Sequence, residues 1–135
     1  MEIYMSNDVE TKVFKSLMSR IKVSSRETII RSTTSYSRGR KHALEVSIDW
    51  KDLKDQYYKQ NGKCYWLNID LNLSDNLISW HPLAISCDRI DNTIGYTKEN
   101  IVISSRFANL GRGAASKDLF ISSLNKIVSS IKYGI

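Results

Sequence analysis

The sequence of 135 residues contains little that would anchor it in a membrane or cross-link it. It has no run of about 18 apolar residues, which argues against a transmembrane helix. Its first residues lack the basic-then-apolar order of a secretory signal. Two cysteines, Cys64 and Cys87, are too few for a disulfide framework or a four-cysteine zinc site. We therefore expect an intracellular, cytoplasmic protein that has no membrane partner and two reduced thiols.

Proline and histidine are also scarce, with Pro82 as the single proline and His42 and His81 as the two histidines. A hydrophobic fraction of 41% is sufficient for one modest core. The length predicts one domain with at most a small appended element.

Positive charge is abundant and unevenly distributed. The net charge is +6, and residues 1–42 carry nine Lys and Arg against four Asp and Glu, whereas residues 43–135 carry eleven against ten. Basic side chains release condensed counterions from DNA, so the N-terminal excess indicates a polyanion partner. A solvated helix with a positive face is the alternative. We divide the chain into a basic N-terminal helix and arm, residues 1–42, and a main domain, residues 43–135.

The hydrophobic pattern predicts an α+β fold. Apolar residues at steps of four predict a helix over residues 8–22, and the polar, basic residues 31–42 predict an arm that becomes ordered on DNA. The other expected elements are a strand at 44–48, a helix at 50–60 capped by Asp49 and ended by Asn61-Gly62, strands at 83–88 and 100–104, a short helix at 105–110 and a last helix at 116–132 capped by Ser116.

The most informative segment is residues 86–100, together with Asn109. It is typical of a strand, a glycine turn, a second strand and the start of a helix. Alternation along the first strand places Asp88 opposite the buried side chains. Asp88 and Asn109 lie twenty-one positions apart with Asn100 between them. Such oxygen ligands suit a hard cation, which keeps several waters that a phosphate can replace.

Residues 43–132 resemble the HNH, or ββα-metal (His-Me finger), endonucleases of bacteriophages. The matching words, in order, are Val46-Ser-Ile-Asp-Trp50, Gln60-Asn-Gly-Lys-Cys64, His81-Pro-Leu, Asp88-Arg-Ile-Asp-Asn, Gly95-Tyr-Thr-Lys-Glu-Asn-Ile101, and Asn109 with Arg112. They span about two thirds of the chain. The resemblance implies a ββα-metal finger over residues 83–112, braced by helices 50–60 and 116–132.

The resemblance also implies roles for residues. Asp88 and Asn109 would hold one Mg²⁺ or Mn²⁺ ion, and Asn100 would clamp the hairpin loop. Arg89 stands where most of the family has a histidine that acts as general base. Arginine stays protonated, so its natural role is to bind the scissile phosphate. The base is left open between His81, Tyr96 and a metal-bound hydroxide.

Further expectations concern DNA contacts and zinc. The residues expected to contact the DNA backbone are Arg38, Arg40, Lys41, Arg106, Arg112 and Lys117. The Cys-x-x-Cys pair that many relatives use for zinc is incomplete, because Leu67 follows Cys64 at the second position. We therefore expect no structural zinc, and we expect aromatic packing by Trp50, Tyr57, Trp66 and Trp80 to stabilise the fold instead.

The sequence thus predicts a metal-dependent DNA endonuclease similar to free-standing phage homing endonucleases, or a phage restriction or recombination nuclease. A double-strand break would need a homodimer or two successive nicks, and the apolar stripes on helices 8–22 and 116–132 are candidate dimer surfaces. Two alternatives are a non-catalytic DNA-binding module on a degenerate nuclease scaffold, which Arg89 favours, and an RNA-processing nuclease.

Overall fold

The computed structural model describes residues 7–32 and 44–131, without the side chains of residues 26–32. The described residues form an α+β fold, in agreement with the predicted class. Its elements are α1 (Asn7–Ser32), α2 (Trp50–Lys59), the 3₁₀ helix η1 (Leu73–Leu77), β1 (Ile85–Arg89), β2 (Ile101–Ser105), α3 (Arg106–Arg112) and α4 (Lys117–Ile131).

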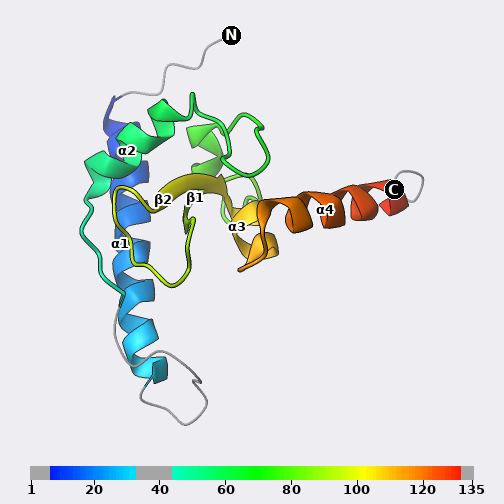
Figure 1. Cartoon of the computed structure of the whole chain (residues 1–135). Helices are drawn as coiled ribbons and strands as arrows, with labels where there is room; N and C mark the ends of the chain where they lie inside the picture. The colour runs from blue at the N-terminus through cyan, green and yellow to red at the C-terminus, as the bar shows by residue number, and fades with distance from the viewer. Residues whose placement is uncertain (1–6, 33–43, 132–135) are drawn as a thin grey trace.

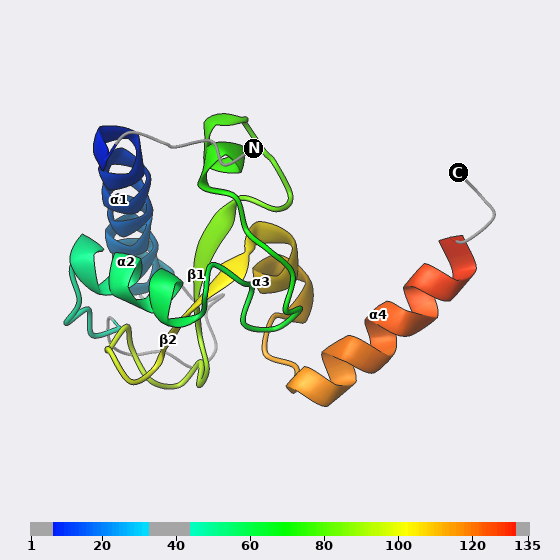
Figure 2. The same ribbon diagram turned by 90° about the horizontal axis from the view of Figure 1, so that it is seen from above.

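The β1–β2 hairpin lies at the centre of the molecule. The strands are antiparallel, with Ile85 opposite Ser105 and Arg89 opposite Ile101. Helices α1 and α2 cover one side of the hairpin and α3 lies on the other (Figure 2). Because both faces are covered, all five residues of β2 are buried. For the same reason Cys87 and Asp88 are both buried on β1, and the predicted alternation of buried and exposed residues does not hold there.

Helix α1 is longer than the sequence predicted and belongs to the main core. It runs to Ser32, beyond the predicted end at residue 22, because no Gly or Pro interrupts residues 23–32. Its apolar stripe, including Phe14 and Leu17, is buried in the same cluster as Ile85 and Ile103. The stripe is therefore not available as a dimer surface. The predicted arm with Arg38, Arg40, Lys41 and His42 lies outside the described residues.

Helix α2 begins and ends as predicted. The carboxylate of Asp49 accepts hydrogen bonds from the backbone N–H groups of Lys51 and Asp52, while the Asp52 carboxylate accepts from the N–H of Asp49. This reciprocal pair is a capping box. The chain then reverses at Asn61 and Gly62, both of which have positive φ.

The expected strand at 44–48 is reduced to one parallel bridge between Val46 and Tyr96. The backbone N–H of Tyr96 donates to the Glu45 carbonyl at 2.7 Å, and the N–H of Ser47 donates to the Tyr96 carbonyl at 3.0 Å. Gly95 allows this approach, because a Cβ there would lie 2.3 Å from the Glu45 carbonyl oxygen. The bridge fixes the β1–β2 loop to the segment that precedes α2.

Helix α4 does not brace the hairpin, in contrast to the prediction. It projects from the body beyond α3 (Figure 1). Phe120 is buried against the core, but Ile127 is 53% exposed and Ile131 is 45% exposed. Trp80, also expected in the core, is 81% exposed. Among the described helices, none combines the length and the apolar content that crossing a membrane requires.

Candidate functional site

Asp88, the penultimate residue of β1, is buried and accepts four hydrogen bonds. Its Oδ2 accepts from Trp66 Nε1 at 2.8 Å, from Arg112 Nε at 3.2 Å and from Arg112 Nη2 at 3.1 Å. Its Oδ1 accepts from the backbone N–H of Arg89 at 2.8 Å. One carboxylate oxygen therefore carries three donors, while the other carries a single backbone donor.

Arg112 is the buried partner of Asp88. Its Nη1 donates to the Ala115 carbonyl at 2.8 Å and its Nη2 donates to the Arg89 carbonyl at 3.1 Å. The guanidinium also stacks over the Trp66 ring, 4.1 Å from the centroid. The predicted phosphate contact of Arg112 does not agree with this geometry, because the side chain is buried and four of its N–H groups already have acceptors.

Asn109 lies on α3, and its side chain contacts β1. Ser105 starts α3 as predicted, since its Oγ accepts from the N–H of Ala108. One turn later, Asn109 Nδ2 donates to Ser86 Oγ at 2.7 Å and to the Cys87 carbonyl at 3.2 Å. The fold therefore brings Asn109 against the backbone directly before Asp88, and the amide oxygen has no hydrogen-bond partner among the described residues.

Asn100 has the clamping geometry that the resemblance implied. The side chain is buried, and its Oδ1 accepts from the N–H of Asp91 at 2.9 Å. Its Nδ2 donates to the carbonyls of Asp91 and Gly95, each at 3.0 Å. These bonds tie the two ends of the β1–β2 loop together.

Asp91 makes a turn, as expected. It accepts from the hydroxyl and the backbone N–H of Thr93. These bonds lower the pKa of its carboxyl group.

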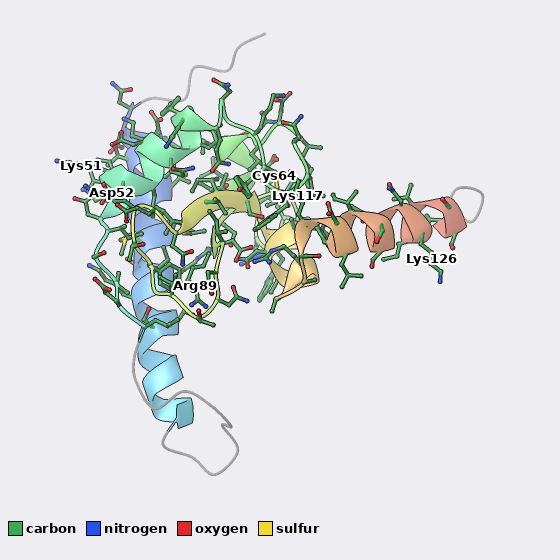
Figure 3. The ribbon with its side chains drawn as sticks, in the orientation of Figure 1. Lys51, Asp52, Cys64, Arg89, Lys117 and Lys126 are labelled. Carbon is green, nitrogen blue, oxygen red and sulfur yellow. The ribbon has the colours of Figure 1, made fainter. Side chains whose placement is uncertain are left out.

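Arg89 lies at the same loop (Figure 3). Its Nη1 donates to the carbonyls of Asn92 and Ile94, both at 2.9 Å, and its guanidinium carbon lies 5.1 Å from the centroid of the Tyr96 ring. A side-chain hydrogen bond also joins Arg89 to the hydroxyl of Tyr96. Arg89 therefore supports the loop.

His81 and Tyr96, the two side chains considered as general bases, are both poorly suited to this role. Nδ1 of His81 accepts from the backbone N–H of Leu83 at 3.0 Å, and its Nε2 lies 3.6 Å from an Asp75 carboxylate oxygen. The lone pair that a base needs is thus already used to cap a loop. Burial raises the pKa of Tyr96, which keeps its hydroxyl protonated near neutral pH.

Two oxygens of this cluster are candidate ligands for a hydrated divalent ion. Within residues 7–32 and 44–131, Asp88 Oδ1 accepts one hydrogen bond, and a carboxylate oxygen has a second lone pair for a metal. Asn109 Oδ1 is the second candidate ligand. Mg²⁺ commonly takes one or two protein oxygens and keeps several waters, so a larger ligand set is not needed. The described residues contain no group of three or more His, Cys, Asp or Glu suited to a metal.

The two cysteines are buried thiols without a disulfide. Cys64 lies beside the hydroxyls of Ser104 and Ser105, and burial raises the pKa of Cys87 to about 12. A thiol with so high a pKa is a poor zinc ligand, because zinc binds the thiolate. The absence of a structural zinc stays a prediction.

Two other residues predicted to contact DNA lie on the helices at this end of the hairpin, Arg106 at the start of α3 and Lys117 at the start of α4. Arg106 stacks over the exposed Trp80 ring, with its guanidinium carbon 5.0 Å from the centroid, and Lys117 Nζ lies 5.9 Å from the Tyr65 ring centroid. Both remain candidates for contacts to a polyanion.

The comparisons with known proteins found no relative: no family model matches this chain, and neither a curated protein nor a solved structure matches it. Interpretation of the site therefore depends on its own geometry and on the motif resemblance.

Sequence reasoning did not identify Trp66 and Arg112 as partners of Asp88. Nothing in the spacing of residues 66, 88 and 112 signals a contact. One weak signal was available: Arg112 follows Asn109 by three positions on a helix, so the two side chains share a face of α3.

Proposed function

We propose that this protein is a metal-dependent DNA endonuclease of the ββα-metal, or HNH, type, which hydrolyses phosphodiester bonds. The observation that supports the proposal is the approach of Asn109 to the backbone directly before Asp88, where Asn109 Nδ2 donates to the Cys87 carbonyl. A two-stranded hairpin followed at once by a helix brings this side chain from α3 against β1. The buried clamp by Asn100 holds the loop between the strands.

In the proposed site, Asp88 and Asn109 would hold Mg²⁺ or Mn²⁺ through their Oδ1 atoms. A bound divalent ion stabilises the negative charge that develops on the phosphate and on the leaving oxygen. Trp66 and Arg112 fix the orientation of the Asp88 carboxylate through Oδ2. The guanidinium of Arg89 would bind the scissile phosphate beside the loop.

No protein side chain is assigned as general base in this proposal. Arg89 stays protonated, the Nδ1 lone pair of His81 accepts from Leu83, and the pKa of Tyr96 is raised. The proton of the attacking water passes to solvent.

The test is cleavage of supercoiled plasmid with Mg²⁺ or Mn²⁺, against EDTA, by the wild type, Asp88→Asn and Asn109→Ala. Asparagine is chosen at position 88 because its side-chain oxygen can still accept from Trp66 and Arg112, whereas alanine would leave these buried donors unsatisfied, at a cost of about 1–3 kcal/mol each. Asp91→Asn, which alters an exposed carboxylate of the same loop, is the matched control.

We expect metal-dependent nicking by the wild type and the control, and none by the two site variants, which still bind DNA in EDTA. Full activity of Asp88→Asn would overturn the metal assignment. An inactive wild type that binds DNA in a salt-sensitive manner would favour the alternative, a non-catalytic DNA-binding module on the same scaffold. Preferential cleavage of RNA would point to an RNA-processing nuclease.

The proposal includes a homodimer, because a single finger cuts one strand. The exposed half of α4 offers the surface: Phe120, Leu124, Ile127 and Ile131 follow a 4-3-4 spacing, which is the seam of a helix pair. The first two pack against the body, and the last two are about half exposed. A homing, restriction or recombination role depends on the target DNA, which cleavage mapping on phage genomic DNA would identify.

A further inference from the structure

Trp80 lies in the segment between η1 and β1, and its side chain is 81% exposed. Its φ is +63°, an unfavourable value for a bulky residue. The residues that follow Trp80 form a turn, in which the N–H of Ala84 donates to the His81 carbonyl at 3.1 Å. A strained backbone that presents a large aromatic ring to solvent indicates a functional surface rather than packing.

The Trp80 ring borders a cavity of about 310 Å³. The cavity is lined by Arg20 from α1, by Asn76, Ile78, Ser79 and Trp80, and by Arg106 from α3. Two guanidinium groups thus reach one hollow from helices that are far apart in the sequence, and no acidic residue is among the described residues that line it. This cavity with its ring and two arginines is called the Trp80 pocket below.

The chemistry of the Trp80 pocket matches a nucleotide with an unstacked base. A flat aromatic ring offers a stacking platform for any base, and guanidinium groups bind a phosphate through several donors. Arg106 lies over the Trp80 ring, 5.0 Å from its centroid, so the phosphate donor and the platform are adjacent. A protein partner is less well matched, because two arginines without an acidic neighbour would have to be desolvated.

The Trp80 pocket adjoins the candidate metal site. Arg106 and Asn109 are three positions apart on α3, which places their Cβ atoms about 5–6 Å apart on one face. The segment that leads into β1 also connects the two places: Ala84 lines the pocket, and two residues later the Ser86 hydroxyl accepts from Asn109. A nucleic-acid strand bound in the pocket would therefore continue toward Asp88.

We propose that the Trp80 pocket binds one unpaired nucleotide, whose base stacks on Trp80 and whose phosphate contacts Arg20 and Arg106. This inference rests on the proposed function and narrows its substrate class. The preferred DNA contains an unpaired nucleotide next to the scissile bond, as in a bulge, a gap or a single-stranded branch.

The test measures binding in EDTA, where metal-dependent cleavage plays no part, by fluorescence anisotropy of labelled DNA. The probes are a perfect duplex, the same duplex with one bulged nucleotide, and a single strand, each also prepared as RNA. The variants are Trp80→Ala, Trp80→Phe and Arg106→Ala. Lys126→Ala, which removes one positive charge, is the control for charge, since this residue lies on the part of α4 that projects from the body and does not line the pocket (Figure 3).

We expect the wild type to bind the bulged and single-stranded probes more tightly than the duplex. Trp80→Ala should weaken binding of these two probes by about 5- to 150-fold, the range for loss of one base–aromatic stack, and leave duplex binding unchanged. Trp80→Phe should restore most of the affinity. Arg106→Ala should weaken binding more than Lys126→Ala.

Equal affinity of Trp80→Ala and the wild type for the unpaired probes would overturn the inference. A change in sedimentation of Trp80→Ala with unaltered DNA binding would also overturn it and make the surface a protein contact. If the protein binds unpaired probes tightly but never cuts DNA, the proposed nuclease function is wrong and the nucleotide-binding role of the pocket stands. Failure of the proposed function and failure of this inference can therefore be distinguished.

Discussion

Asp88 and Arg112 form a buried ion pair with exposed fractions of 7% and 5%. Removal of two charges from water is costly, and the cost is offset here because the carboxylate has four donors and the guanidinium has further acceptors. The residue assigned to the metal is thus also part of the core. Substitutions at this position affect stability as well as activity.

Replacement of Arg112 by methionine should lower the free energy of unfolding by about 3–5 kcal/mol, because Asp88 would remain buried without its counter-charge. Lys117→Met, at an exposed position of the neighbouring helix, should change it by less than about 0.5 kcal/mol. Urea unfolding followed by circular dichroism measures both. A change below 1 kcal/mol for Arg112→Met would contradict the buried pair.

His81→Asn separates the two roles considered for the histidine. The asparagine oxygen can accept the hydrogen bond from the Leu83 N–H in place of Nδ1, but it cannot take a proton near neutral pH. We expect the rate of DNA cleavage to stay within a few-fold of wild type. A fall of about 10²–10⁴-fold would show that His81 is the general base.

At this scale, local signals in the sequence were informative and distant ones were not. The cap at Asp49 and the turn at Asp91 could be predicted because each side chain bonds to backbone two or three residues away. Arg112 could not be placed, since its partners at Asp88 and Trp66 come from other elements. Arg112 was predicted to contact the DNA backbone at the surface, although its guanidinium is buried and paired with Asp88.

Among the elements, the β1–β2 loop is held from three directions. Asn100 ties its ends, Arg89 donates to its carbonyls, and the bridge between Val46 and Tyr96 fixes it to the segment before α2. A rigid loop keeps the backbone around Asp88 in place for ligand binding.

Gly95→Ala should destabilise the protein by about 1–3 kcal/mol or more, because the new methyl group would overlap the Glu45 carbonyl oxygen. Gly111→Ala is the matched control. Its Cβ would meet Phe120 at an ordinary 3.5 Å, and replacement of a helical glycine by alanine should add about 0.5–1 kcal/mol of stability. Thermal unfolding of both variants provides the measurement, and a neutral Gly95→Ala would refute the close approach.

Element boundaries were predictable where a stop or start signal exists. Helix α2 has a start signal at Asp49 and a stop signal at Asn61-Gly62, and both of its ends were predicted correctly. Helix α1 has no stop after residue 22, so its last ten residues were missed. The apolar stripe of α4 was identified correctly, but such a stripe does not reveal whether its partner is the same chain.

At the scale of the whole molecule, α1, α2, the hairpin and α3 share one core, from which α4 projects (Figures 1 and 2). This arrangement leaves Ile127 and Ile131 exposed near the end of α4, away from the body. A second copy paired through α4 would present two sites related by a two-fold axis.

The proposed dimer can be tested by sedimentation at micromolar concentration. We expect the wild type to dimerise and the double variant Ile127→Ser, Ile131→Ser to be monomeric, since both side chains lie on the exposed half of one helix face. Lys126→Ala should sediment like the wild type. A wild type that stays monomeric with and without DNA would exclude a symmetric dimer through α4.

The most direct measurement for the central claim is plasmid cleavage by Asn109→Ala beside the wild type, in Mg²⁺ and in EDTA. Asn109 is the better probe because it is half-buried and outside the ion pair, so its loss leaves the core intact. The account predicts nicking by the wild type in Mg²⁺ only, and a loss of nicking in the variant with DNA binding preserved. Equal cleavage by both proteins, or wild-type cleavage that persists in EDTA, would contradict it.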